Sequence, residues 1–113
     1  MLNDSPKLDR AFQALSDPVR RGMLARLSRG PASVSELAKP LSISLPAVLQ
    51  HLKALESSGL VASVKKGRVR TVRVEPGVLA AAEDWLVSRR HEWESRLDRF
   101  EQHLETIKMK ERK

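Results

Sequence analysis

The spacing of apolar residues changes at Gly59, and this change limits the folds that the chain can adopt. Before Gly59, apolar side chains recur every three or four residues, the spacing of helices that bury one face. Over residues 60–74 apolar and polar side chains alternate, which is typical of strands. Beyond Pro76-Gly77 the helical spacing returns. The sequence therefore predicts a mainly α fold with a small β-hairpin, in the order α-α-α-α-β-β-α and with a long C-terminal helix.

Helix-start signals divide the chain before Gly59 into four short helices. At three of the starts a side-chain oxygen can cap the first amides, and a proline or a glutamate in the first turn supports the start. These pairs are Asp17 with Pro18, Ser33 with Glu36, and Ser44 with Pro46. The predicted helices span residues 7–15, 18–27, 34–39 and 45–58. In the fourth helix, the predicted core face consists of Leu45, Val48, Leu52 and Leu55.

Basic residues are concentrated in the part of the chain that precedes the long helix. Residues 1–74 contain 13 Lys/Arg and 5 Asp/Glu, a net charge of +8, whereas residues 75–113 contain 8 and 9, a net charge of −1. A basic module joined to a balanced tail indicates binding to a polyanion. Tyrosine is absent and only 4% of the residues are aromatic. Because single strands are bound by stacking their bases on aromatic rings, this composition favours double-stranded DNA over RNA.

Two short helices joined by a tight turn and followed by a hairpin with a basic tip form a winged helix-turn-helix. In this arrangement the second helix of the pair enters the major groove, and the hairpin, or wing, can reach phosphates or the minor groove. The expected DNA contacts are Ser44, Pro46, Ala47, Gln50, His51, Lys53, Lys65, Lys66, Arg68 and Arg70.

Some of these residues also have a second interpretation. His51 either contacts a base or phosphate, or packs at the edge of the helix pair with one ring nitrogen satisfied. The basic residues of the wing either bind DNA or keep exposed edge strands soluble. Arg20 and Arg21, which start the second helix, are interpreted as surface or ion-pair residues rather than DNA contacts.

Several short motifs, in the same order along the chain, resemble the ArsR family of winged-helix repressors over roughly residues 10–100. They are Ala14-Leu15-Ser16-Asp17-Pro18-Val19-Arg20-Arg21, Ser33-Val34-Ser35-Glu36-Leu37-Ala38, Ser44-Leu45-Pro46-Ala47-Val48, His51-Leu52-Lys53-Ala54-Leu55-Glu56, Gly59-Leu60-Val61 and Gly67-Arg68. The resemblance implies a homodimer that represses its own operon or a neighbouring one and leaves DNA on a signal. The chain departs from the family at Leu49, where a serine near the DNA is usual, and at Val72, where tyrosine is frequent.

The last predicted helix, residues 78–107, has an apolar seam along its length. The seam consists of Leu79, Ala82, Leu86, Trp93, Leu97, Phe100, Leu104 and Ile107, with Trp85 beside it. One helix cannot bury such a seam on so small a domain, so we expect it to meet a second copy of the chain, with a cofactor pocket as the alternative. The expected dimer contacts are Leu8, Phe12, Leu15, Trp85, Leu86, Trp93, Leu97, Phe100 and Leu104. A two-fold dimer predicts an operator that is an imperfect palindrome.

The composition also limits cofactors and chemistry. The chain has no cysteine, which excludes disulfides and thiolate metal sites. Relatives in the family sense metals through cysteines of the third helix or through His and carboxylates of the last helix, and neither His91 nor Glu94 reproduces the second pattern. We expect no metal, no cofactor and no enzymatic activity, since no catalytic motif is present.

The chain is expected to form one domain, residues 1–113, with a DNA-binding core at about 17–75 and dimerisation by helices at about 7–15 and 78–107. No apolar run is long enough to cross a bilayer, and charges in Met1 to Arg10 interrupt any leader, so we expect a cytoplasmic protein. The inducing signal is not encoded in a recognisable motif. Two other functions remain open at this stage: a winged-helix protein-interaction module that does not bind DNA, and a nonspecific architectural DNA-binding protein.

Overall fold

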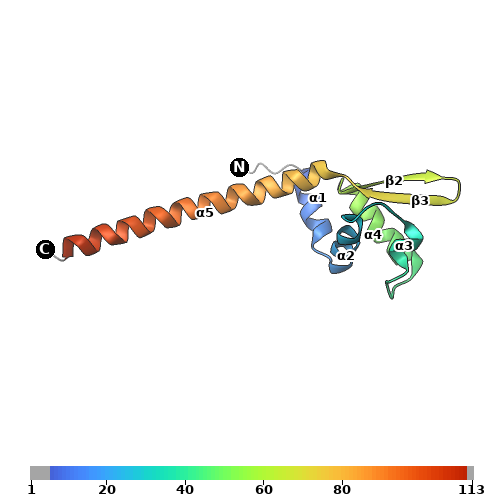
Figure 1. The fold of residues 1–113 in the computed structure, drawn as a ribbon, viewed down its shortest axis with the longest axis horizontal. Coiled ribbons are helices and arrows are strands. Elements are labelled where there is room, and N and C mark those ends of the chain that lie inside the picture. Colours follow the sequence, from blue (N-terminus) through green and yellow to red (C-terminus); the bar gives the residue numbers. More distant parts are fainter. Residues whose placement is uncertain (1–5, 112–113) are drawn as a thin grey trace. The chain divides into compact units, whose positions relative to one another are not determined.

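The computed structural model describes residues 6–111, and the order of its elements is that of a winged helix (Figure 1). The elements are α1 (Pro6–Leu15), α2 (Pro18–Leu27), β1 (Ala32–Ser33), α3 (Val34–Ala38), α4 (Leu45–Ser57), β2 (Val61–Lys66), β3 (Val69–Val74) and α5 (Pro76–Glu111). They divide into two compact units, Met1–Ala82 and Glu83–Lys113. Residues 1–5, which contribute to the argument against a leader, lie outside the described residues.

The predicted caps start three of the helices. Asp17 and Ser44 each accept a hydrogen bond from the amide three residues further along, at 3.0 and 3.3 Å. Ser33 and Glu36 form a reciprocal capping box, with N···O distances of 3.1 and 3.0 Å. Each bond satisfies an amide that has no partner within its own helix. The predicted starts of α2, α3 and α4 are therefore confirmed.

Two details of the helix prediction are wrong. α5 spans Pro76–Glu111 rather than residues 78–107; its earlier start fits a proline in the first turn, which lacks an amide hydrogen where no partner is needed. Leu45 is 55% exposed and does not belong to the core face of α4. The buried stripe of that helix begins only at Val48, so the first turn extends beyond the core.

The sheet has three antiparallel strands in the order β1-β3-β2, one more than the sequence predicted. β1 has only two residues, which is too short for an alternating pattern to be recognised. It pairs with β3 through Ala32 opposite Val72. β2 and β3 form the predicted hairpin, with Lys66 opposite Val69 and Gly67 at a φ of +61° in the turn.

The hydrophobic core of the first unit lies between its helices and the sheet. Four of its side chains have no exposed surface: Val48 and Leu55 of α4, Leu60 just before β2, and Val72 of β3. Val72, one of the two departures from the family pattern, is therefore a packing position. Because α4 is buried on one side only, its opposite side faces outward.

The chain leaves α4 through a tight reversal at Gly59. The amide of Leu60 donates to the carbonyl of Leu55 at 3.1 Å, the bond of a Schellman cap. Gly59 has a φ of +80°, and a Cβ placed on it would lie 2.9 Å from Cγ2 of Val78. This reversal places β2 against α4.

The second unit is the remainder of α5, and every side chain over 88–111 is exposed. Ion pairs one turn apart join Arg89 to Glu92 at 2.7 Å and Arg90 to Glu94 at 3.3 Å. The helices within residues 6–111, α5 included, lack an apolar stretch long enough to cross a membrane.

Replacing Gly59 by alanine should destabilise the fold more than the same change at Gly67. Both positions have positive φ, which costs an alanine about 1–2 kcal/mol. At Gly67 the new methyl group meets nothing within 4 Å, whereas at Gly59 it forces Val78 to move. Urea unfolding of the two variants measures the difference, and equal losses of unfolding free energy would contradict the reversal described above.

Candidate nucleic-acid interface

The side of α4 opposite the core is exposed and carries two polar side chains and a proline. Pro46, Gln50 and Lys53 follow one another at spacings of three and four residues, and all three are exposed. These residues come from the predicted set and lie together on one face. Ser44 and Ala47 are joined by the cap of the helix, and Ala47 is half-buried.

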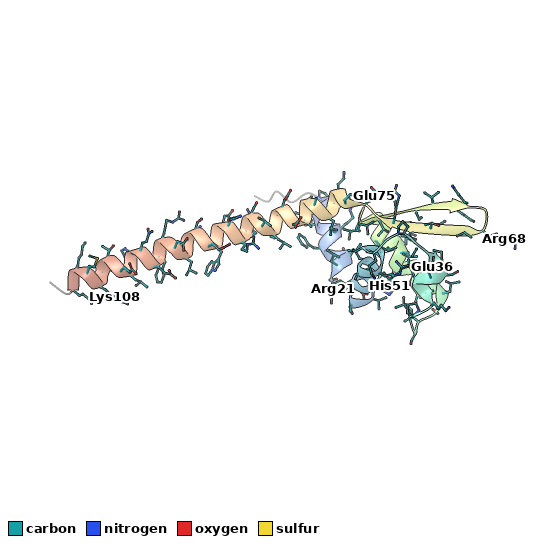
Figure 2. The ribbon with its side chains drawn as sticks, in the orientation of Figure 1. Arg21, Glu36, His51, Arg68, Glu75 and Lys108 are labelled. Atoms are coloured by element: carbon teal, nitrogen blue, oxygen red, sulfur yellow. The ribbon has the colours of Figure 1, made fainter. Side chains whose placement is uncertain are left out.

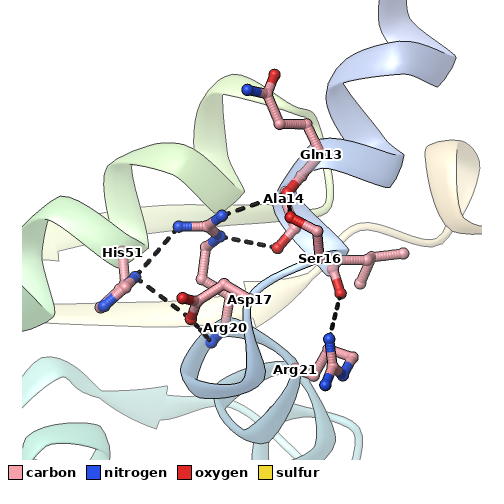
Figure 3. Close-up of polar contacts among 8 residues, drawn as sticks. Gln13, Ala14, Ser16, Asp17, Arg20, Arg21 and His51 are labelled. Atoms are coloured by element: carbon pink, nitrogen blue, oxygen red, sulfur yellow. Dashed lines mark hydrogen bonds and ion pairs between the residues drawn. The ribbon is translucent and has the colours of Figure 1, made fainter.

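His51 lies at one edge of this face, toward α2. Its Nδ1 is 3.3 Å from Nη1 of Arg20 and 3.8 Å from Oδ2 of Asp17 (Figure 3). The ring is half-buried, and its Nδ1 faces Arg20 and Asp17. This corresponds to the second interpretation of His51, in which the ring packs at the edge of the helix pair with one nitrogen satisfied. A contact between the same ring and DNA stays a prediction.

Arg20 and Arg21 hold the end of α1, a role that the sequence interpretation missed. Nε of Arg20 donates to the carbonyl of Ala14 at 2.8 Å, and Nη1 of Arg21 donates to the carbonyl of Leu15 at 2.8 Å (Figure 3). The last carbonyls of a helix have no partner within it, and arginines can bind them. The signal in the sequence was a pair of arginines five and six residues after the end of a predicted helix.

The wing divides its basic residues between two faces. Lys65 and Arg70 are directly opposite each other, on the same face of the hairpin as the buried Val61 and Val72. Lys66 points to the other face. Figure 2 shows Arg68 at the tip of the hairpin. Of the four predicted wing contacts, Lys65 and Arg70 thus share the side of the sheet that packs against α4.

A chain of hydrogen bonds connects this side of the wing to α4. Nη1 of Arg70 lies 3.5 Å from Oγ of Ser63, a weak contact, and Ser63 in turn donates to Oε1 of Glu56. A groove of about 400 Å³ lies beside them, lined by Leu49, Leu52, Lys53, Glu56 and Arg70. Glu56 thereby connects α4 to the wing through Ser63; the sequence analysis included Glu56 in a family motif but gave it no role at the site.

The carboxyl group of Asp17 is stabilised in its charged form. The amide of Arg20 donates to it and lowers its pKa below the ordinary value of 3.8, and electrostatic interactions with His51 and Arg20 act in the same direction. Partial burial opposes this shift. The cap of α2 and the contact with α4 therefore both favour an ionised Asp17.

The last helix carries the candidate metal ligands. Oε1 of Glu94 lies 3.3 Å from Nε of Arg90, so this carboxylate is already engaged by a cation. Among residues 6–111, no three His, Cys, Asp or Glu side chains are close enough to hold one metal ion.

Comparisons with known proteins agree with this geometry. A family model described as a helix-turn-helix domain matches residues 15–64. The HTH-type transcriptional regulator Rv2034 of Mycobacterium tuberculosis is 48% identical over 73 residues, which are 65% of this chain and 68% of that protein. The transcriptional repressor SdpR of Bacillus subtilis is 27% identical over 81 residues, covering 72% of this chain and 90% of the repressor. A crystal structure of an ArsR family transcriptional regulator, RHA00566, has a TM-score of 0.78 and 48% identity, covering 84% of this chain and 98% of the other.

The recognition-type helix, the capped helix pair and the basic wing define a winged-helix transcriptional regulator. The chain belongs to the ArsR family of such regulators. The fold class and the family predicted from the motifs are thus confirmed.

Replacing Asp17 by asparagine should produce a stability loss that depends on pH. Asparagine still caps a helix, but it carries no charge for His51 and Arg20. Because the pKa of Asp17 is lowered in the folded state, its charge contributes stability above pH 3.8 and loses this contribution as the pH falls further. Wild type should therefore exceed Asp17→Asn in urea resistance at pH 7, and the gap should close below pH 3.8. A gap that stays constant with pH would contradict the ionised cap.

Proposed function

We propose that the protein is a homodimeric repressor that binds double-stranded operator DNA in its own operon or a neighbouring one. The observation that carries this proposal is that two cationic side chains, one from α4 and one from the wing, line the same groove. Lys53 on the outer side of α4 and Arg70 on the wing line the same groove, which the core holds in place. A helix in a major groove flanked by a wing at the backbone requires this arrangement.

The residues of the interface have different tasks in this proposal. Gln50 and Lys53, with Ser44, Pro46 and Ala47 at the entering end of α4, contact base edges, where a bidentate contact discriminates by about 1–3 kcal/mol. His51 contacts DNA from the edge of the helix pair. Wing cations contact phosphates, which supply affinity independent of sequence. These cations are Lys65, Lys66, Arg68 and Arg70.

The second unit supplies the dimer contact. Trp93, Leu97 and Phe100 are 66, 42 and 58% exposed, and Leu86 and Leu104 continue the same seam. Removing such side chains fully from water contributes roughly 1.5–3 kcal/mol each. A second copy of α5 offers a matching seam, and Trp85, Leu8, Phe12 and Leu15 are proposed to extend the contact. A two-fold dimer presents two α4 helices about 34 Å apart, so the operator is an imperfect palindrome.

Repression is proposed because the relative SdpR is named a transcriptional repressor. The proposal includes a cytoplasmic location, where the operator DNA of such a repressor lies. It assigns the protein no enzymatic activity, metal or cofactor. The proposed DNA-binding core comprises about residues 17–75, within the first unit, and residues 1–113 act as one functional domain.

Selection of bound fragments from a random DNA library tests this function directly. The wild-type protein should enrich an imperfect palindrome and bind it about a thousandfold more tightly than unselected DNA at the same salt concentration. Equal affinity for both DNAs would indicate an architectural protein. Absence of binding to any duplex would indicate a protein-interaction module, and either outcome rejects the proposal.

Matched variants locate the interface in the same assay. In the double variant Lys65→Ala with Arg70→Ala, the slope of log affinity against log salt concentration should become less steep, by about 0.9 for each phosphate that is no longer bound. Lys108→Ala, which removes an exposed charge from α5, should leave the slope unchanged. Gln50→Ala should lower the ratio between selected and random DNA. An unchanged slope for the double variant would remove the wing from the interface.

Charges placed in the apolar seam should separate the subunits. Trp93→Glu with Leu97→Glu should give a monomeric or poorly soluble protein with little affinity for the selected palindrome, because the seam can no longer be buried. Ser95→Glu, an exposed position between them, is the matched control and should remain dimeric. Sedimentation measures the mass, and a stable wild-type monomer at micromolar concentration would overturn both the dimer and the palindrome.

A further inference from the structure

α4 has a second apolar surface that the core does not use. Val48, Leu52 and Leu55 are buried and form the part of α4 that belongs to the core. Leu45 and Leu49, one helical turn apart on an adjacent side, are 55 and 46% exposed. We call these two residues the leucine pair. The leucine pair thus lies on α4, the same helix that carries the polar outer side described above.

The surroundings of Leu49, one member of the leucine pair, are cationic. Leu49 lines the groove between α4 and the wing, together with Lys53 and Arg70. The one carboxylate of that groove, on Glu56, accepts a hydrogen bond from Ser63. An apolar surface bordered by two cations is poorly suited to a cationic or an entirely apolar partner. It fits a partner that is a polyanion and carries small apolar groups between its charges.

We propose that the leucine pair reads thymine, by contact with the 5-methyl groups that line the major groove of DNA. This inference rests on the proposed function and adds a second mode of sequence reading to it. The major groove displays hydrogen-bond donors and acceptors on every base pair, and the methyl group of thymine is its distinctive apolar group. A leucine side chain has no hydrogen-bonding atom, so it favours a base that presents this methyl group over one that presents a donor or acceptor.

Two kinds of contact therefore divide the recognition of the operator. Gln50 and Lys53 form hydrogen bonds, whereas the leucine pair selects A·T pairs in one orientation at neighbouring positions. A cytosine at the same place would present its amino group to an apolar side chain and lose a hydrogen bond to water. Each thymine methyl group removed from water strengthens binding about fourfold.

Deoxyuridine provides the sharpest test, because it pairs like thymidine and lacks only the methyl group. A palindrome selected by the wild-type protein is resynthesised with deoxyuridine in place of one thymine at a time. At one or two positions in each half-site, wild-type Kd should rise about fourfold, and by about fifteenfold when both half-sites are changed together. This measurement alters the DNA alone and requires no variant to fold.

Variants connect the effect to the leucine pair. Leu49→Ala or Leu45→Ala should bind thymine-containing DNA more weakly and respond less to deoxyuridine at the position that each residue contacts. Val64→Ala is the matched control, because Val64 is 50% exposed but lies on the face of the wing opposite Lys65 and Arg70. It should retain the full response to deoxyuridine.

The outcomes separate this inference from the proposed function. Sequence-specific binding that no deoxyuridine substitution weakens would overturn the reading of thymine and leave the repressor proposal intact. If the wild-type protein shows no sequence-specific binding, both the reading of thymine and the repressor proposal are wrong. If Leu49→Ala changes the sedimentation of the free protein while its response to deoxyuridine stays that of wild type, the leucine pair is a self-association surface and the inference is wrong.

Discussion

The burial of one side of α4 is the constraint on which the rest of the DNA-binding unit depends. Val48 and Leu55 have no exposed surface, and the sheet and α2 pack on the same core. In a core this small, rotation of α4 by a few tens of degrees would expose a fully buried side chain, at a cost of about 1.5–3 kcal/mol. The outer side of the helix, with Gln50 and Lys53, is therefore oriented by hydrophobic packing rather than by contacts of its own.

Polar contacts then connect the neighbouring elements to α4 at both of its edges. On one edge, Arg20 binds the end of α1 and approaches His51. On the other edge, Ser63 joins Glu56 of α4 to the wing. Partly exposed contacts of this kind contribute little to stability individually. Their effect is positional, since they limit where the wing and α1 can lie relative to α4 within the first unit.

The fold could be predicted from the sequence where a local signal has one meaning. Capping oxygens, Gly59 and the change of period located the helices and the hairpin, because each depends on neighbours within a few residues. β1 could not be predicted, since its two residues form a strand only by pairing with Val72 and its neighbour far along the chain. For the site, the pattern identified which residues are candidates. It could not show that Lys65 lies opposite Arg70, that Arg20 caps α1, or that Leu45 lies outside the core, because register and packing decide these points.

Exposed apolar side chains on α5 connect assembly to DNA binding in the proposed dimer. A chain of 113 residues has a small core, and α5 continues from it with Trp93 and Phe100 exposed. If two copies bury these side chains together, each dimer brings two sets of α4 and wing to DNA, and its affinity depends on the concentration of the chain. At low concentration a single subunit reaches only half of the phosphates, so occupancy of a palindrome rises more steeply than the protein concentration. A repressor of its own operon built in this way limits its own synthesis sharply without a ligand, and any signal that loosens the seam lowers DNA affinity without touching α4.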